Sequence, residues 1–138
     1  WELGTHWAED TSCCEMLGYQ YFAGVNDTPQ DYARAVQLFE LAVSRGGMWQ
    51  APLLARCYLE GTGCMKDYSR AKWLLENTSD NRKLESWYYA MGLMYAEGLG
   101  VSEDIKRGVE YLQKSSLPQA KEALLRYKKT LFGKWVRR

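Results

Sequence analysis

Apolar residues along this chain recur at the spacing of an amphipathic α-helix, in blocks of nearly constant length. The first block has an apolar, a small and an aromatic residue at positions i, i+1 and i+4, then a glycine three residues later: Leu17, Gly18, Tyr21 and Gly24. The next two blocks repeat this order with Leu54, Ala55, Tyr58 and Gly61, and with Met91, Gly92, Tyr95 and Gly98. Each tyrosine follows the previous one by 37 residues. We therefore predict one helix per block that ends at the glycine, with a neighbouring helix crossing closely at the small residue.

A second helical pattern follows each block and begins with an aspartate. These aspartates are Asp31, Asp67 and Asp104, and a large apolar residue stands eight positions after each: Phe39, Leu75 and Leu112. An aspartate in this place accepts a hydrogen bond from the first helical turn and complements the helix dipole. The sequence thus predicts three helix pairs, with one extra residue in the loop before Asp31. Because one pair cannot bury both of its apolar stripes, the pairs are expected to stack into a solenoid.

The joint pattern resembles the Sel1-like repeat, a relative of the tetratricopeptide repeat. The resemblance covers about residues 12–119, and the third block, from Met91 to Asp104, follows the repeat most fully. The second block has Ala55 in place of the first glycine, and the first block lacks the second glycine of the loop. The resemblance implies a right-handed α-solenoid that scaffolds protein–protein contacts and has no catalytic site common to the family.

The domain organisation predicted from these patterns is one all-α domain over residues 1–138. Its parts are an N-terminal cap (1–11), three helix-turn-helix repeats (12–50, 51–85 and 86–119) and a C-terminal capping helix (120–138). The N-terminal cap is predicted because Leu3, Gly4 and Trp7 echo the leading-helix motif. The C-terminal helix is predicted because apolar residues continue at helical spacing after Pro118, which is a common first residue of a helix.

A partner-binding surface is expected on the leading helices, which usually line the concave side of a helix-pair solenoid. The face next to the buried triplet carries Ser12, Glu15, Tyr19 and Phe22, then Trp49, Pro52, Arg56 and Leu59, then Ser86, Tyr89, Leu93 and Ala96. Aromatic residues and arginine dominate binding hot spots. The predicted partner-binding residues are therefore Glu15, Tyr19, Phe22, Trp49, Arg56, Tyr89 and Leu93. The alternative is that some of these rings pack between adjacent helix pairs.

Composition and charge narrow the class of partner. The chain has six Trp and ten Tyr against three Phe, and its formal net charge is +1. We expect a protein partner and no nucleic acid, because no overall excess of positive charge is present. No membrane insertion is expected, because no apolar run approaches the roughly 18 residues that span a bilayer. Residues 1–33 carry six acidic and no basic side chains, whereas residues 120–138 carry seven basic ones. This asymmetry favours either self-association through oppositely charged ends or a simply solvated basic end.

The cysteines and the single histidine offer few routes to chemistry. Cys57 and Cys64 flank a glycine-rich turn, and they are interpreted either as a disulfide or as two small buried thiols. His6 has no neighbours at metal-ligand spacing, so neither a metal nor another cofactor is expected. A thiol-dependent enzyme or redox protein using one of the cysteines is the alternative to a binding function. An unusually reactive cysteine at neutral pH would favour that alternative.

The function predicted from the sequence is a non-catalytic protein-binding module that uses the aromatic face of its leading helices. The resemblance adds finer expectations, because many similar proteins look like exported or host-facing bacterial factors and others act as adaptors in protein quality control. It implies a bacterial adaptor, or an immunity protein that blocks a toxin or effector. The sequence leaves the location of the protein open, and the same resemblance favours an exported or periplasmic one.

Overall fold

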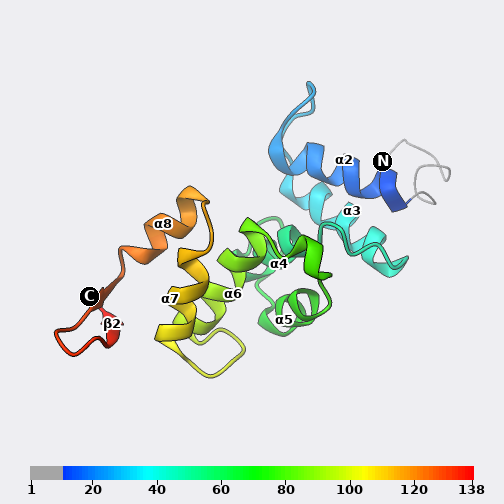
Figure 1. The fold of residues 1–138 in the computed structure, drawn as a ribbon. Coiled ribbons are helices and arrows are strands. Elements are labelled where there is room, and N and C mark those ends of the chain that lie inside the picture. The colour runs from blue at the N-terminus through cyan, green and yellow to red at the C-terminus, as the bar shows by residue number, and fades with distance from the viewer. Residues whose placement is uncertain (1–10) are drawn as a thin grey trace. The chain divides into compact units, whose positions relative to one another are not determined.

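The computed structural model describes residues 11–138, which are mostly helical (Figure 1). The elements are α2 (Thr11–Ala23), α3 (Tyr32–Ser44), α4 (Ala51–Glu60), α5 (Tyr68–Glu76), a 3₁₀ turn (Asp80–Arg82), α6 (Glu85–Glu97), α7 (Ile105–Gln113), α8 (Pro118–Leu124), β1 (Tyr127–Lys129) and β2 (Trp135–Arg137). The chain divides between Ser79 and Asp80 into two compact units, which we call unit 1 and unit 2. The N-terminal cap predicted over residues 1–11, with His6, lies outside the described residues except for Thr11.

The predicted helix pairs are α2–α3 and α4–α5 in unit 1, and α6–α7 in unit 2. One backbone hydrogen bond closes every pair, because the aspartate that precedes the second helix donates its N–H to the carbonyl of the motif tyrosine. The N···O distances are 2.8 Å for Asp31 and Tyr21, 3.0 Å for Asp67 and Tyr58, and 2.8 Å for Asp104 and Tyr95. The tyrosine and aspartate of the sequence pattern therefore mark the two sides of each hairpin.

The three aspartates cap the second helices, as the sequence predicts. Each carboxylate accepts a hydrogen bond from the backbone N–H of the arginine three residues later. The distances are 3.2 Å from Arg34, 3.0 Å from Arg70 and 3.1 Å from Arg107. Such caps are worth about 1 kcal/mol each, because they satisfy backbone donors that the helix leaves without partners.

The loops inside the pairs depend on left-handed residues. Gly61 and Gly63, like Gly98 and Gly100, have φ between 67° and 74°. In the first pair, Gly24 has the same conformation, but Asn26 stands where the second glycine would be and has a φ of 55°. Asparagine tolerates this region better than most residues. Asp27, which follows, also has a positive φ of 62°, so the first loop keeps the left-handed residue at the place of the second glycine and adds another after it.

The small residues of the leading helices lie where the paired helix approaches closely. A Cβ on Gly18 would lie 2.7 Å from the Phe39 ring, and one on Gly92 would lie 2.6 Å from Leu112. Ala55, the third small residue, is completely buried. These contacts confirm close helix crossing at Gly18 and Gly92.

The two pairs of unit 1 are joined by a polar cluster, which we call the Glu40 latch. Glu40 of α3 accepts hydrogen bonds from Tyr58 Oη of α4 at 2.6 Å and from Arg70 of α5 at 2.7 and 3.1 Å. Burial raises the pKa of Glu40, but the bonds from Arg70 and Tyr58 outweigh it and leave this pKa below its usual value. Burial and the bond to Glu40 raise the pKa of Tyr58. The latch therefore contains a carboxylate, a neutral phenol and a guanidinium at neutral pH.

The predicted C-terminal helix over residues 120–138 is wrong beyond Leu124, because α8 ends there and an antiparallel hairpin follows. Tyr127 pairs with Arg137, Lys128 with Val136 and Lys129 with Trp135. Gly133 (φ 81°) forms the turn, and the Thr130 side chain accepts a hydrogen bond from the Lys134 N–H at 3.0 Å. Aromatic and β-branched residues favour strands, and a glycine in a short loop favours a hairpin. These preferences override the helical spacing of the apolar residues.

Candidate functional site

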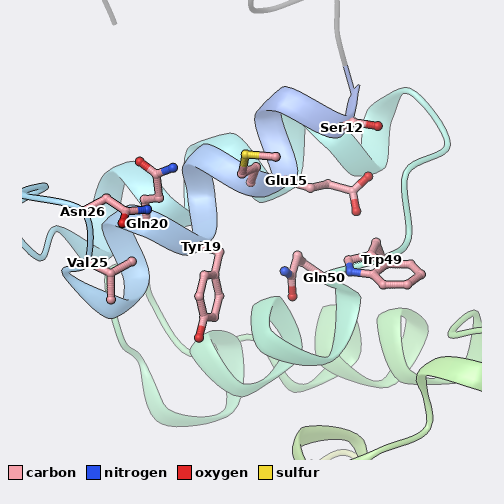
Figure 2. A pocket seen from close by; sticks show the side chains of 9 residues that line it. Ser12, Glu15, Tyr19, Gln20, Val25, Asn26, Trp49 and Gln50 are labelled. Atoms are coloured by element: carbon pink, nitrogen blue, oxygen red, sulfur yellow. The ribbon is translucent and has the colours of Figure 1, made fainter.

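A pocket of about 510 Å³ lies in unit 1 beside α2. It is lined by three stretches of chain: one face of α2, the loop after α2 and the two residues before α4. The lining residues are Ser12, Glu15, Met16, Tyr19, Gln20, Val25, Asn26, Trp49 and Gln50. In Figure 2 the Tyr19 and Glu15 side chains project from α2 toward the segment that carries Trp49 and Gln50.

Helical geometry explains why α2 presents these side chains together. Positions 12, 15, 16, 19 and 20 follow the three- and four-residue spacing of one helix face. Cys14 and Gly18 lie on the other side of α2 and are buried. Tyr19 is 45% exposed and Trp49 is 53% exposed, so both rings are open to solvent at the pocket. Gly47 lets the chain approach the Glu15 carboxylate, because a Cβ there would lie 2.7 Å from Glu15 Oε1.

The pocket combines aromatic surface with one negative charge. Glu15 is the charged residue of the lining, and the polar remainder consists of one hydroxyl and three amides: Ser12, Gln20, Asn26 and Gln50. None of the nine lining residues is a lysine or an arginine. Thr28 donates a hydrogen bond of 3.4 Å from its hydroxyl to the Gln20 side-chain oxygen, which ties the loop to α2. This chemistry suits a ligand group with apolar length and a positive end.

Three of the seven predicted partner-binding residues line the pocket: Glu15, Tyr19 and Trp49. Phe22 is half-buried and packs edge-to-face against Tyr32, with ring centroids 5.4 Å apart. Arg56 lies on α4 outside the lining, with its side chain 11% exposed and its Nε 3.9 Å from Glu60. The predicted face is therefore brought together at α2 and at Trp49, but not along the whole of α4.

Tyr89 and Leu93 correct the prediction that the same face is open in the third pair. They are only 6% and 8% exposed, and they belong to a core cluster with Ala120 and Ala123 of α8 and Tyr127 of β1. The C-terminal segment covers them because its apolar residues need a surface to bury against. Tyr89 and Leu93 are core residues of unit 2.

The pocket also contains residues that the sequence analysis did not name as binding residues: Met16, Gln20, Val25, Asn26 and Gln50. Met16 and Gln20 adjoin the predicted positions on α2, so a wider helical face would have included them. Val25 and Asn26 belong to the loop that has one residue more than the other two loops. This extra residue is the feature of the sequence that distinguishes the first loop as a possible part of the site. Gln50 directly follows Trp49.

Cys57 and Cys64 have the character of structural thiols. Cys57 and Cys64 are free thiols, which is the second of the two interpretations of the sequence, and Cys64 Sγ donates a hydrogen bond of 3.5 Å to the Cys57 carbonyl oxygen. Burial, with Cys64 nearby, raises the pKa of Cys57 to about 12. Burial and the carboxylates of Glu40 and Asp67 also raise the pKa of Cys64. Both shifts disfavour the thiolate form that nucleophilic chemistry needs.

Among residues 11–138, no three His, Cys, Asp or Glu side chains are grouped so as to hold a metal ion. None of the helices in this described part has the length and apolar character needed to cross a membrane.

Comparison with known proteins identifies the repeat. The family model of the Sel1 repeat matches residues 11–47, 53–81 and 88–117, which is more than half of the chain. The chain belongs to the Sel1 repeat family. Its three matched segments contain the helix pairs described above, apart from the first residues of α4 and α6.

The chain is similar in sequence to several known proteins. Over 120 residues the chain is 29% identical to the Sel1-repeat-containing protein YjcO of Escherichia coli K12, a match covering 80% of this chain and 52% of that protein. It therefore spans about half the length of the curated relatives it matches. It is also 29% identical to HRD3B of Arabidopsis thaliana, an ERAD-associated E3 ubiquitin-protein ligase component, over 65% of this chain and 14% of that protein.

Solved structures confirm the fold class. The structure of c5321, a protective antigen of uropathogenic Escherichia coli with an SLR fold, matches with a TM-score of 0.59 and 29% identity over 82% of this chain and 23% of that one. A Sel1 repeat protein from Oxalobacter formigenes matches with a TM-score of 0.57 and 24% identity over 83% of this chain and 44% of that one. The predicted all-α solenoid class is thus confirmed, with a small strand pair added. Sel1 repeats generally mediate protein–protein interaction.

Proposed function

We propose that this chain is a protein-binding module and that the pocket beside α2 receives a segment of its partner. The observation that carries this proposal is the exposure of Tyr19 and Trp49 on a pocket of about 510 Å³. Half-exposed tyrosine and tryptophan beside a concavity are typical of binding hot spots, because they bury a large area for little conformational entropy. A protein chain that inserts one long side chain would cover both rings.

The negative charge of the pocket favours a partner side chain with a positive charge. Glu15 supplies the negative charge, and residues 1–33 hold six acidic and no basic side chains. A lysine or arginine would lay its apolar stem along the aromatic rings and direct its charge to the Glu15 carboxylate. The proposed partner segment is therefore basic, and its association should weaken as salt concentration rises.

Family membership supports a protein partner without naming one. HRD3B is a component of a ubiquitin ligase, so one protein of similar sequence takes part in a protein assembly. The roles of bacterial adaptor, immunity protein or inhibitor of a toxin stay predictions that rest on family resemblance. Self-association through oppositely charged ends also stays a prediction, and it rests on the charge asymmetry of the sequence. Two basic residues of the C-terminal end already pair inside unit 2: Arg126 with Glu97 at 2.8 Å and Arg137 with Glu103 at 2.5 Å.

A displayed library of random peptides tests the proposal. We expect selection on the native chain to yield peptides that bind it but fail to bind the Tyr19→Ala/Trp49→Ala variant. Met65→Ala is the matched control, because Met65 is exposed and lies outside the pocket. If no selected peptide depends on Tyr19 and Trp49, the pocket is not the binding site. Pocket-dependent peptides without lysine or arginine would leave the site in place but contradict its preference for basic segments.

The Glu15→Gln variant tests the charge preference directly. For a pocket-dependent basic peptide we expect Kd to rise about tenfold, since a charge-assisted hydrogen bond becomes a neutral one. The remaining affinity should depend less on salt than that of the native chain. Isothermal titration at two salt concentrations measures both effects.

A further inference from the structure

The loop between β1 and β2 exposes two large apolar side chains at its tip. Leu131 and Phe132 are 102% and 98% exposed, and they are adjacent in sequence. The loop that carries them is ordered by its own hydrogen bonds: Thr130 N–H to the Lys134 carbonyl at 2.7 Å, and Gly133 N–H to the Thr130 carbonyl at 2.9 Å. In Figure 1 the loop, drawn in red, extends away from α7 and α8. Such exposure is costly in water, so the tip is a candidate contact surface.

Basic residues flank this apolar tip in the sequence. Lys128, Lys129 and Lys134 are exposed and lie within four residues of Leu131 or Phe132. No aspartate or glutamate occurs in residues 123–138. The two arginines at the end of the chain have partners within unit 2. Arg137 forms an ion pair with Glu103 at 2.5 Å, and Arg138 Nε donates a hydrogen bond of 3.0 Å to the Tyr127 carbonyl oxygen. The hairpin thus combines a bare apolar tip with three outward lysines.

The base of the hairpin is fixed to the core of unit 2. Tyr127 is 4% exposed within the core cluster, and Trp135 packs against the same cluster. Burial raises the pKa of Tyr127, which keeps this phenol neutral. The tip is therefore presented on a rigid support, and little conformational entropy would be lost when it binds.

We propose that this hairpin docks unit 2 on the surface of an anionic lipid bilayer. Leu131 and Phe132 enter the boundary between headgroups and acyl chains, and Lys128, Lys129 and Lys134 contact the negative headgroups. An apolar insertion and a basic patch together supply the two signals that stable peripheral binding needs. The tip is convex and only two residues wide, which fits entry between lipids better than docking on a protein surface.

This surface contact differs from membrane spanning. The apolar tip is two residues long, whereas a spanning helix needs about 20 apolar residues. The hairpin belongs to unit 2 and the proposed peptide pocket to unit 1, so each function can fail without the other.

Vesicle cosedimentation of the full chain tests the proposal. The probes are vesicles of phosphatidylcholine with about one third phosphatidylserine, and vesicles of phosphatidylcholine alone. We expect binding to the anionic vesicles at low salt and at least tenfold weaker partition for Leu131→Ser/Phe132→Ser, since burying either side chain is worth more than a factor of ten. Leu125→Ser is the matched control, because Leu125 is also exposed in unit 2 but lies outside the hairpin loop.

A second variant separates the contribution of the lysines from that of the apolar tip. Replacing Lys128 and Lys129 by alanine should weaken partition about fivefold per lysine and reduce its dependence on salt. Unchanged far-ultraviolet circular dichroism shows that the variants remain folded.

The proposal is overturned if the native chain fails to sediment with anionic vesicles, if both vesicle types bind equally, or if the tip variant binds like the native chain. It is also overturned if soluble polyglutamate, but not vesicles, binds the native chain in a manner that requires Leu131 and Phe132. That result would assign the hairpin to an acidic protein.

Discussion

The leading helices of the first and third pairs, α2 and α6, carry equivalent positions on one face but treat them in opposite ways. On α2, Glu15 and Tyr19 line an open pocket. On α6, the matching positions are Tyr89 and Leu93, and both are buried in a cluster with α8 and β1. The repeat thus sets which side chains share a face, and the segment that follows in the chain decides whether that face stays open.

The two units also differ in the contacts that supplement their helix pairs. Unit 1 joins its two pairs through the polar Glu40 latch, away from the pocket lining. Unit 2 covers its single pair with the apolar side of α8 and with Tyr127. Unit 1 also buries apolar side chains of α4, such as Leu54 and Leu59, so the latch adds a polar link to an apolar core.

The largest loss of stability is expected when the packing of α8 and Tyr127 on α6 is disrupted. Tyr127→Ala removes a buried ring from the core cluster and should lower the free energy of unfolding by about 3 kcal/mol or more. Urea unfolding followed by circular dichroism measures the loss. Phe132→Ala, in the same hairpin but fully exposed, should leave the unfolding midpoint almost unchanged. Equal losses for the two variants would contradict the assignment of Tyr127 as the cover.

Tyr19 of α2 and Leu93 of α6 occupy the same position of the repeat, so alanine substitutions there compare the open face with the buried one. Leu93→Ala should cost about 2 to 4 kcal/mol, because it leaves a cavity in a packed cluster. Tyr19→Ala should cost less than about 1 kcal/mol, because its ring is half exposed. The same urea measurement checks both. A large loss for Tyr19→Ala would mean that Tyr19 supports the fold instead of forming an open binding surface.

The Glu40 latch is tested by removing one hydroxyl. Tyr58→Phe deletes the 2.6 Å hydrogen bond to the Glu40 carboxylate and should cost about 1.5 kcal/mol. Tyr95→Phe is the matched control at the same repeat position. The Tyr95 ring stacks on Tyr111, and Arg107 lies 4.5 Å from its centroid, so phenylalanine keeps both contacts. If both variants lose equal stability, the latch contributes nothing specific to unit 1.

The smallest expected effect is a loss of stability in acid. The folded-state pKa of Glu40 lies below its usual value, so the unfolded chain takes up this proton first as pH falls. The contribution of the latch is therefore complete above the usual glutamate pKa and disappears as pH falls through the folded-state pKa. Urea midpoints between pH 7 and pH 3 should fall less steeply for Glu40→Gln than for the native chain. Glu76→Gln, at the matching position of α5, should keep the native slope.

Most of the helical framework could be predicted because its signals are local and repeated. Asp31, Asp67 and Asp104 each cap the helix that follows, and Gly18 and Gly92 each lie at a close helix crossing. Such features depend on a few neighbouring residues and on one paired helix. A period of 37 residues therefore carries enough information to place them.

The candidate site was only partly predictable, because exposure depends on segments distant in sequence. Tyr89 and Leu93 look like Glu15 and Tyr19 in position, but the cover that buries them begins at Pro118. The hairpin itself was missed because apolar residues at helical spacing concealed the turn at Gly133. Tyr19 and Trp49 could be predicted as binding residues from residue type and helical spacing, whereas Val25 and Asn26 line the pocket because of the backbone conformation of the first loop.

That first loop has a consequence for how the repeat can diversify. Where the second and third loops have Gly63 and Gly100, the first has Asn26, and its amide lines the pocket. The additional residue is absorbed within the loop, and Asp31 still closes the hairpin at 2.8 Å. Recognition can therefore be retuned by altering loop length and side chains alone, while the surrounding scaffold retains its architecture.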